Sequence, residues 1–216
     1  MVRISVISFD MDGTITDPSF VDSVWLEGIP RLYAIRNSVS FEDAITYVKM
    51  EYEKVGRERL EWYDLSYWTE KFGLDVSPED VLGSFQHRIR IFPEVNEVLE
   101  EFKDKGFRLI IVTNAHREFV NLELERTKIG HYFERVFSST SDFGLVKKTV
   151  NLYQKVCGIM GVSPGEMVHV GDDLCFDFVV PSELGIKAFH LDRTGESSGN
   201  LVIHSLKELG KRVTGE

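Results

Sequence analysis

The sequence predicts an α/β fold in which a parallel sheet forms the core and one α-helical segment is inserted into it. Short apolar runs alternate with segments of helical period, and one long stretch rich in aromatic and charged residues interrupts the alternation. The length of 216 residues suits one ordinary domain with a modest insertion. A content of 43 % hydrophobic and 28 % charged residues is typical of a globular protein.

The expected strands are the apolar runs. They cover residues 1–9, 107–112, 136–137 and 167–170, with a further short strand near residue 202. Polar residues follow three of these runs directly, among them Asp10, Thr113 and Asp172. Because open α/β sheets bind ligands beyond the carboxyl ends of their parallel strands, we expect these three side chains to converge there.

Helical period appears between the strands, at residues 95–102 and 150–160, and again in the tail after residue 205. Residues 16–91 contain no comparable strand, so we expect them to form the helical insertion, with residues 1–15 and 92–216 as the core. One helix of the insertion is expected over residues 41–54, opened by Ser40 with Asp43 three positions on.

Composition limits the partners and the location. A formal net charge of −10 argues against a nucleic-acid or anionic-membrane binder, which needs a basic face. The two cysteines have no spacing typical of a disulfide framework or a zinc site, and no apolar run approaches the roughly 20 residues of a membrane span. We therefore expect a soluble cytoplasmic protein with a small-molecule partner, as a monomer or a dimer.

Asp10 and Asp12 are separated by one residue, and Gly13 permits a sharp turn after them, so both carboxylates can reach the same side of a loop. One carboxylate can attack phosphorus while the other handles protons, provided that a metal ion neutralises the repulsion between the anions. By itself, this short segment is equally compatible with a turn rich in aspartate after a strand.

Residues 9–14 (FDMDGT) resemble the first motif of the haloacid dehalogenase superfamily, the hydrolases with an aspartate nucleophile. Residues 110–114 (IIVTN), 144–147 (GLVK) and 169–177 (HVGDDLCFD) resemble its second, third and fourth motifs, in the order of the family. The resemblance spans Asp10 to Asp177 and implies a Rossmann-like core with a helical cap inserted between the first two motifs.

The resemblance implies a role for each matching residue. Asp10 is the nucleophile and a metal ligand, and Asp12 is the general acid and base and binds the metal through its backbone carbonyl. Thr113, Asn114 and Lys147 hold the phosphoryl oxygens, as hydroxyl, amide and ammonium donors can. Asp172 is the further ligand of Mg²⁺, an ion that prefers oxygen donors, and Asp177 acts on the metal through water.

Two positions leave a choice. Lys147 is followed by Lys148, and the distance from Gly144 favours Lys147 as the phosphate-binding lysine, with Lys148 as a solvated residue at a helix start. Asp173 is either a neighbour of the metal or an acid favoured by the dipole at a helix N-terminus, and we favour the second interpretation.

These observations predict a Mg²⁺-dependent phosphatase that acts on a small phosphorylated metabolite, such as phosphoglycolate or a sugar phosphate, through an aspartyl-phosphate. A phosphomutase of the same superfamily is the alternative. A 2-haloacid dehalogenase is disfavoured, because displacement of a halide needs no proton from Asp12. A non-catalytic phosphate-binding module is disfavoured by the complete set of motif residues.

The insertion contains candidates for contacts with the substrate, although solvated or structural roles are favoured for each. The cationic candidates are Arg31, Arg36, Lys49, Arg57, Arg59, Arg88 and Arg90, and the aromatic candidates are Trp25, Tyr63 and Trp68. His116 and Arg117 follow the second motif and can either approach the phosphate or start a surface helix. His169 lies within an expected strand and is interpreted as a core histidine with satisfied hydrogen bonds.

Overall fold

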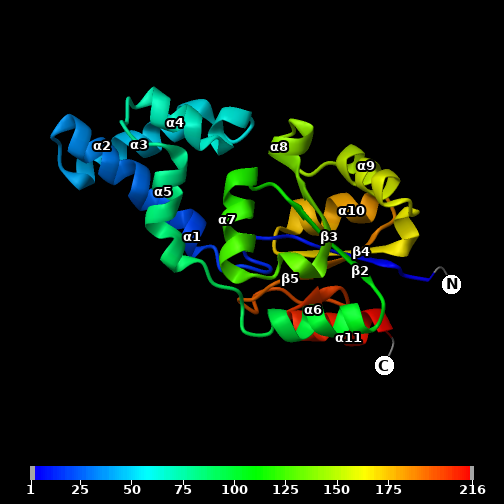
Figure 1. The fold of residues 1–216 in the computed structure, drawn as a ribbon. Helices are drawn as coiled ribbons and strands as arrows, with labels where there is room; N and C mark the ends of the chain where they lie inside the picture. Colours follow the sequence, from blue (N-terminus) through cyan, green and yellow to red (C-terminus); the bar gives the residue numbers. More distant parts are fainter. Residues whose placement is uncertain (1–2, 215–216) are drawn as a thin grey trace.

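The computed structural model describes residues 3–214 and contains a six-stranded parallel sheet with the strand order β3-β2-β1-β4-β5-β6 (Figure 1). The strands are β1 (Val6–Phe9), β2 (Arg108–Thr113), β3 (Phe133–Ser138), β4 (Met167–Gly171), β5 (Lys187–Leu191) and β6 (Val202–Ile203). This sheet confirms the α/β fold class. The sequence had indicated every strand except β5, whose five residues include a lysine and a histidine.

Helices cover both faces of the sheet, because side chains of successive strand residues point to opposite faces. Ile7 and Phe9 belong to the apolar core under α6 (Val95–Asp104) and α11 (Leu206–Thr214). Val6 belongs to the core under α9 (Val150–Met160), on the other face. The remaining helices of this part are α7 (Arg117–Thr127), α8 (Ser139–Phe143) and α10 (Val180–Glu183).

The segment between β1 and α6, residues 16–91, is helical and lies to one side of the sheet (Figure 1). It contains α1 (Ser19–Ser23), α2 (Ile29–Asn37), α3 (Phe41–Val55), α4 (Leu65–Lys71) and α5 (Pro78–Phe85), with a π-helical turn at Val24–Gly28 and short 3-10 turns at Leu60–Tyr63 and Gln86–Arg88. We call it the helical insert. The two ends of the helical insert pair with each other through an antiparallel β-bridge between Thr16 and Ile91.

The helical insert has an apolar core of its own around Leu65 and Trp68, to which Phe119 of α7 also belongs. Helix α3 begins as expected, because the Ser40 hydroxyl accepts a hydrogen bond from the Asp43 amide at 3.1 Å. Among the described residues, no helix is long and apolar enough to cross a membrane. The fold thus places the carboxyl ends of β1, β2 and β4 on the side where the helical insert leaves and returns (Figure 1).

Candidate active site

Asp10 directly follows the central strand β1 and is 6 % exposed. Its amide donates a hydrogen bond to the carbonyl of Val170 on β4 at 2.9 Å, which extends the sheet by one residue and fixes the start of the loop. Burial raises the pKa of the Asp10 carboxyl well above its ordinary value; the Lys148 ammonium opposes this effect, and Asp177 and Asp172 add to it. Such a carboxyl needs cations around it in order to act as an anion.

The lysine that contacts Asp10 is Lys148 and not Lys147, the residue that we expected to bind phosphate, and Lys148 is buried where we expected a solvated side chain. The Lys148 ammonium is 2 % exposed and donates hydrogen bonds to Oδ1 of Asp10 and to Oδ1 of Asp177. Burial alone lowers the pKa of Lys148, but the two carboxylates hold it above its ordinary value. Lys147 points elsewhere: it pairs with Glu58 of the helical insert, and its ammonium lies over the ring of Phe176.

Asp177 is completely buried and holds Lys148 in place. Its Oδ1 also lies 3.0 Å from Nε2 of His169, and its Oδ2 accepts a hydrogen bond from the Asp173 amide at 3.1 Å. Burial opposes ionisation of Asp177, but Lys148 and His169 outweigh it and lower the pKa to about 2. Asp177 is therefore an anion whose oxygens already have partners, so it is better suited to orient Lys148 than to bind a metal ion directly.

His169 has the structural role that its place in a strand predicted. Its Nδ1 lies 2.8 Å from the Ser8 hydroxyl, and its Nε2 lies 3.0 Å from the Tyr153 hydroxyl as well as near Asp177. Burial lowers the pKa of His169, so the ring is neutral and Nε2–H is the donor to the carboxylate. The Ser8 hydroxyl then donates to Nδ1, and every polar atom of the ring has a partner.

A divalent metal ion fits at this edge of the sheet. Oxygen atoms of Asp10, Asp172 and Asp177 lie within 4.8 Å of one another, and carboxylate oxygens are the ligands that such ions prefer. Two glycines make room for this cluster, since a Cβ at Gly13 would overlap with the Asp172 carboxylate and one at Gly171 with Asp177. The oxygens of Asp10 and Asp172 have the fewest other partners and would hold the ion.

Asp173 caps a helical segment. Its Oδ1 accepts hydrogen bonds from the amides of Cys175 and Phe176, both at 2.8 Å, at the start of the π-helical segment Leu174–Val179. This geometry agrees with the helix N-terminal interpretation, and Asp173 is not part of the carboxylate cluster formed by the described residues.

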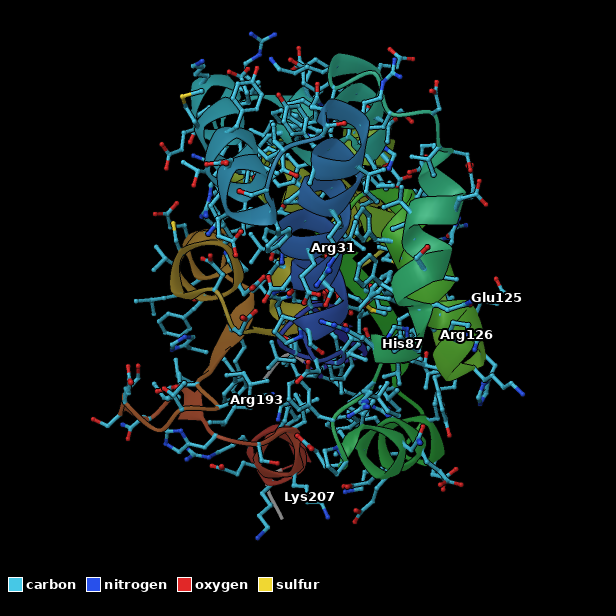
Figure 2. The ribbon with its side chains drawn as sticks, turned by 90° about the vertical axis from the view of Figure 1, so that its left-hand side faces the viewer. Arg31, His87, Glu125, Arg126, Arg193 and Lys207 are labelled. Carbon is cyan, nitrogen blue, oxygen red and sulfur yellow. The ribbon has the colours of Figure 1, made fainter. Side chains whose placement is uncertain are left out.

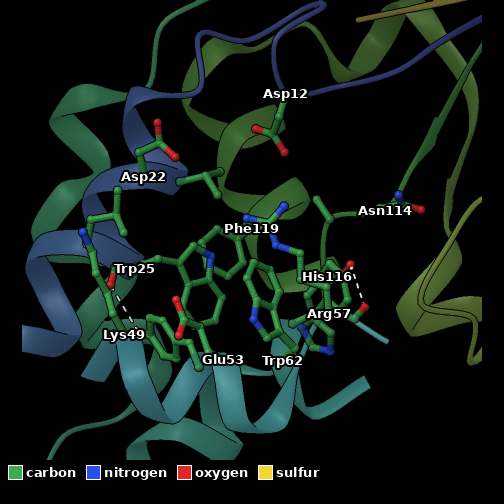
Figure 3. A pocket seen from close by; sticks show the side chains of 16 residues that line it. Asp12, Asp22, Trp25, Lys49, Glu53, Arg57, Trp62, Asn114, His116 and Phe119 are labelled. Atoms are coloured by element: carbon green, nitrogen blue, oxygen red, sulfur yellow. Dashed lines mark hydrogen bonds between the residues drawn. The ribbon is translucent and has the colours of Figure 1, made fainter. Parts of the chain in front are cut away.

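Asp12 lies beside the cluster and lines a cavity under the helical insert (Figure 3). Its Oδ1 accepts a hydrogen bond from the Thr16 hydroxyl at 3.4 Å. Burial raises the pKa of Asp12 to about 6, against the opposing interaction with Glu123. A carboxyl group with a pKa near neutrality can both give and take a proton, as a general acid and base must.

Glu123 of α7 is a feature that the sequence did not reveal. Its side chain is fully buried and interacts with Asp12 and Thr16, although neither carboxyl oxygen forms a hydrogen bond of normal geometry within the described residues. Burial, and then the charge of Asp12, raise the pKa of Glu123 well above its ordinary value. One glutamate in an amphipathic helix gives no sequence signal of this kind.

Thr113 and Asn114 follow β2 at the same edge of the sheet. The Thr113 hydroxyl accepts a hydrogen bond from the Ala115 amide at 3.2 Å, so it holds the turn and keeps its own proton to donate. The Asn114 Oδ1 accepts one from the Ser139 hydroxyl at 2.7 Å, which leaves the amide NH₂ as the free donor. Both side chains thus offer hydrogen-bond donors at the end of β2, the strand that pairs with β1 ahead of Asp10.

Arg193 supports the loop after β1 from the opposite end of the chain. Its guanidinium donates to the carbonyls of Gly13 and Thr14 at 3.1 and 2.7 Å and to Glu94 at 2.8 Å. It also lies over the ring of Phe92, 3.5 Å from the centroid. Arg193 belongs to the loop after β5, and Figure 2 shows it above the red helix α11. Arg193 thus connects the chain segment that precedes the helical insert with the segment that follows it.

The cavity has a volume of about 690 Å³ and lies between the sheet edge and the helical insert (Figure 3). It is lined by Asp12, Val21, Asp22, Trp25, Leu26, Lys49, Tyr52, Glu53, Gly56, Arg57, Trp62, Tyr63, Asn114, Ala115, His116 and Phe119. The candidates that line the cavity are therefore Trp25, Lys49, Arg57 and Tyr63 from the insertion, together with His116. The others lie elsewhere: Trp68 is buried in the core of the insert, and Arg31, Arg36, Arg59 and Arg88 pair with acidic residues.

Comparisons with known proteins agree with this geometry. A family model described as haloacid dehalogenase-like hydrolase matches residues 4–177. The chain is 28 % identical to the GMP/IMP nucleotidase YrfG of Escherichia coli over 169 residues, which cover 78 % of this chain and 74 % of that protein. It is 25 % identical to the pyrophosphatase PpaX of Bacillus cereus, with coverage of 80 % and 76 %.

Among solved structures, a HAD phosphatase from Thermococcus onnurineus superposes on this chain with a TM-score of 0.86 at 27 % identity, covering 99 % of both chains. The overlap includes the helical insert as well as the sheet.

Proposed function

The chain belongs to the haloacid dehalogenase-like hydrolases, and from that membership we propose a Mg²⁺-dependent phosphatase that hydrolyses a small phosphorylated metabolite through an aspartyl-phosphate. The contact between Asp10 and the buried Lys148 carries this proposal, because it places a nucleophile beside a fixed positive charge at the ends of the strands. Asp12 lies on the same loop, two residues further along the chain.

In the first step, an Asp10 oxygen attacks phosphorus, and the bond from phosphorus to the ester oxygen breaks as the new bond to Asp10 forms. Asp12 gives its proton to the departing oxygen, which leaves as an alcohol. In the second step, Asp12 takes a proton from water, whose oxygen attacks phosphorus and releases inorganic phosphate and free Asp10. The pKa of Asp12, raised by burial, suits both transfers.

The remaining residues stabilise the negative charge on the phosphoryl oxygens. Lys148 supplies a charge that needs no reorganisation, because Asp177 already holds it. Thr113 and Asn114 supply a hydroxyl and an amide donor. Mg²⁺ held by Asp10 and Asp172 would neutralise the repulsion between the carboxylate and the phosphate.

The helical insert, residues 16–91, is proposed as a cap over the core formed by residues 1–15 and 92–216. A cap excludes water from the reacting atoms, and here its cavity adjoins Asp12, where the leaving group of the substrate would lie. The cytoplasmic location and the choice between monomer and dimer stay predictions.

The test is phosphate release from p-nitrophenyl phosphate with Mg²⁺ and with EDTA. Phosphoglycolate, sugar phosphates, pyrophosphate, GMP and IMP extend the panel, the last three because the named relatives act on such compounds. Release that needs metal and is absent in the Asp10→Asn variant supports the proposal. Release that persists in that variant contradicts it, because turnover would then not need an aspartyl-phosphate on Asp10.

A further inference from the structure

Near-parallel aromatic rings form one wall of the cavity, and they come from three separate elements. The ring of Trp25 stacks on Phe119 with centroids 5.6 Å apart and an interplanar angle of 21°, and on Trp62 at 6.3 Å and 29°. Trp25 belongs to the π-helical turn, Phe119 to α7 and Trp62 to the 3-10 turn after α3. The guanidinium of Arg57 lies over Trp62, 5.3 Å from the centroid, and a flat ligand would stack on this ring in place of the guanidinium.

The cavity has room for a ligand larger than the smallest phosphorylated metabolites. Its volume of about 690 Å³ lies within the range of about 300–1,000 Å³ that is typical of pockets for drug-sized ligands. Asp12 and Asn114 lie toward the catalytic end, and Lys49, Glu53 and Trp62 lie toward α3 (Figure 3). A ligand whose phosphate reaches Asp10 therefore has room for a long leaving group along the aromatic wall.

Three charged side chains of the cavity lack the partners that the charged residues of the catalytic cluster have. Within residues 3–214, the carboxylates of Asp22 and Glu53 and the ammonium of Lys49 form no hydrogen bond or ion pair. A carboxylate can only accept hydrogen bonds, so Glu53 and Asp22 favour a ligand with N–H or O–H donors. Lys49 and Arg57, which also line the cavity, favour a ligand that carries a carbonyl oxygen as well.

We propose that the cavity binds the base and sugar of a nucleoside monophosphate, with the base against the wall of Trp25, Trp62 and Phe119 and with Glu53 accepting hydrogen bonds from its ring edge. Guanine and hypoxanthine suit this arrangement best, since the ring edge of each has an N–H group for Glu53 beside a carbonyl oxygen. Adenine presents a ring-nitrogen acceptor there instead and is disfavoured. The inference rests on the proposed phosphatase activity and specifies its substrate.

Binding tests the inference without turnover. In the Asp10→Asn background with Mg²⁺, titration calorimetry with GMP, AMP and ribose 5-phosphate should give the tightest binding for GMP. Adding Glu53→Gln should weaken GMP binding about tenfold or more, because a site built to accept from N–H groups discriminates strongly. Adding Trp62→Ala should weaken GMP and AMP alike by about tenfold, through lost stacking.

Matched controls come from the helical insert itself. Glu70→Gln and Tyr47→Ala change an exposed acid on α4 and an exposed ring on α3 that do not line the cavity, and both should bind GMP as the parent does. Equal affinity for GMP and ribose 5-phosphate in the parent, or unchanged GMP binding in Glu53→Gln and Trp62→Ala, would overturn the inference.

Kinetics separate this inference from the proposed function. If the native enzyme hydrolyses p-nitrophenyl phosphate and the kcat/KM for GMP exceeds that for ribose 5-phosphate by about tenfold or more, both stand. If it hydrolyses p-nitrophenyl phosphate but shows no preference for GMP, the inference about the substrate fails and the phosphatase remains. If it hydrolyses nothing, the proposed function fails, and GMP binding alone decides the role of the cavity.

Discussion

The carboxylate cluster at the strand ends and the cavity under the helical insert differ in how their charges are held. In the cluster, Lys148 forms hydrogen bonds to both Asp10 and Asp177. The His169 ring and the Asp173 amide supply the other hydrogen bonds to the Asp177 carboxylate. In the cavity, Lys49 and Glu53 are exposed, and no hydrogen bond fixes their charged groups within the described residues. A preorganised charge suits a reaction common to many substrates, whereas open charges suit recognition of one ligand.

The largest effect that this comparison predicts is on Asp10. Asp10→Asn keeps the volume of the side chain but removes the nucleophile, so kcat should fall on the order of 10³-fold or more. Stopped assays of phosphate release, with circular dichroism to confirm folding, make the measurement. An Asp10→Asn enzyme that is folded and retains more than a few per cent of native turnover would place the chemistry elsewhere.

The next effect distinguishes the two adjacent lysines. Lys148→Met should lower kcat about 10²-fold or more, because it removes a fixed charge from the phosphoryl oxygens. Lys147→Met is the matched control and should stay within about threefold of the native rate, since exposed ion pairs such as that with Glu58 contribute little. The reverse order of the two variants would restore Lys147 as the phosphate-binding residue.

Lys147 and Lys148 also show where prediction from the sequence fails. Apolar runs that end in aspartate or threonine predicted β1, β2 and β4 and the convergence of Asp10, Thr113 and Asp172, because strand burial and parallel pairing leave a regular pattern. The choice between Lys147 and Lys148 depends on which side chain the loop before α9 turns toward the buried carboxylates. Spacing cannot decide that, since the loop has no period.

Other features depend on contacts between distant residues and left no local pattern. Arg193 braces carbonyls of Gly13 and Thr14, about 180 positions away along the chain. Strand β5 carries Lys187 and His190 and was missed because its sheet neighbours, rather than its own composition, make it a strand. The cavity contains only some of the aromatic residues of the insertion, and the packing of Trp68 into the core of the insert distinguishes it from Trp25 and Trp62.

A moderate effect on stability is expected at Glu123, whose oxygens form no hydrogen bond of normal geometry among the described residues but which is buried like the cluster. Glu123→Leu should raise the free energy of unfolding by about 1–3 kcal/mol, because it removes a buried carboxyl group whose weak interactions with Asp12 and Thr16 do not offset the cost of burying it. Urea denaturation of the apo protein makes the measurement. A decrease in the free energy of unfolding would show that Glu123 stabilises the fold. A gain in stability together with a loss of activity would show that Glu123 serves the catalytic role of Asp12 at a cost in stability.

The smallest effect concerns two carboxylates of opposite kind, Asp192 in the loop after β5 and Glu53 in the cavity. The Asp192 carboxylate accepts hydrogen bonds from the amides of Thr194, Gly195 and Ser197 and from the Thr194 hydroxyl. The bond from the Thr194 hydroxyl does most to lower the pKa of Asp192. Because the folded pKa lies below the unfolded value of about 3.9, the ionised form stabilises the protein at neutral pH. That stability is lost as the pH falls from the unfolded pKa through the folded one.

Asp192→Asn should therefore lower the Tm at pH 7, and the gap to the native protein should narrow as the pH falls below about 4. Glu53→Gln, a carboxylate with no such bonds, should leave the Tm unchanged at both pH values. Thermal unfolding followed by circular dichroism makes both measurements. A fall in Tm for Glu53→Gln would mean that the free protein already holds this carboxylate, and the contrast between a preorganised cluster and an open cavity would then no longer hold.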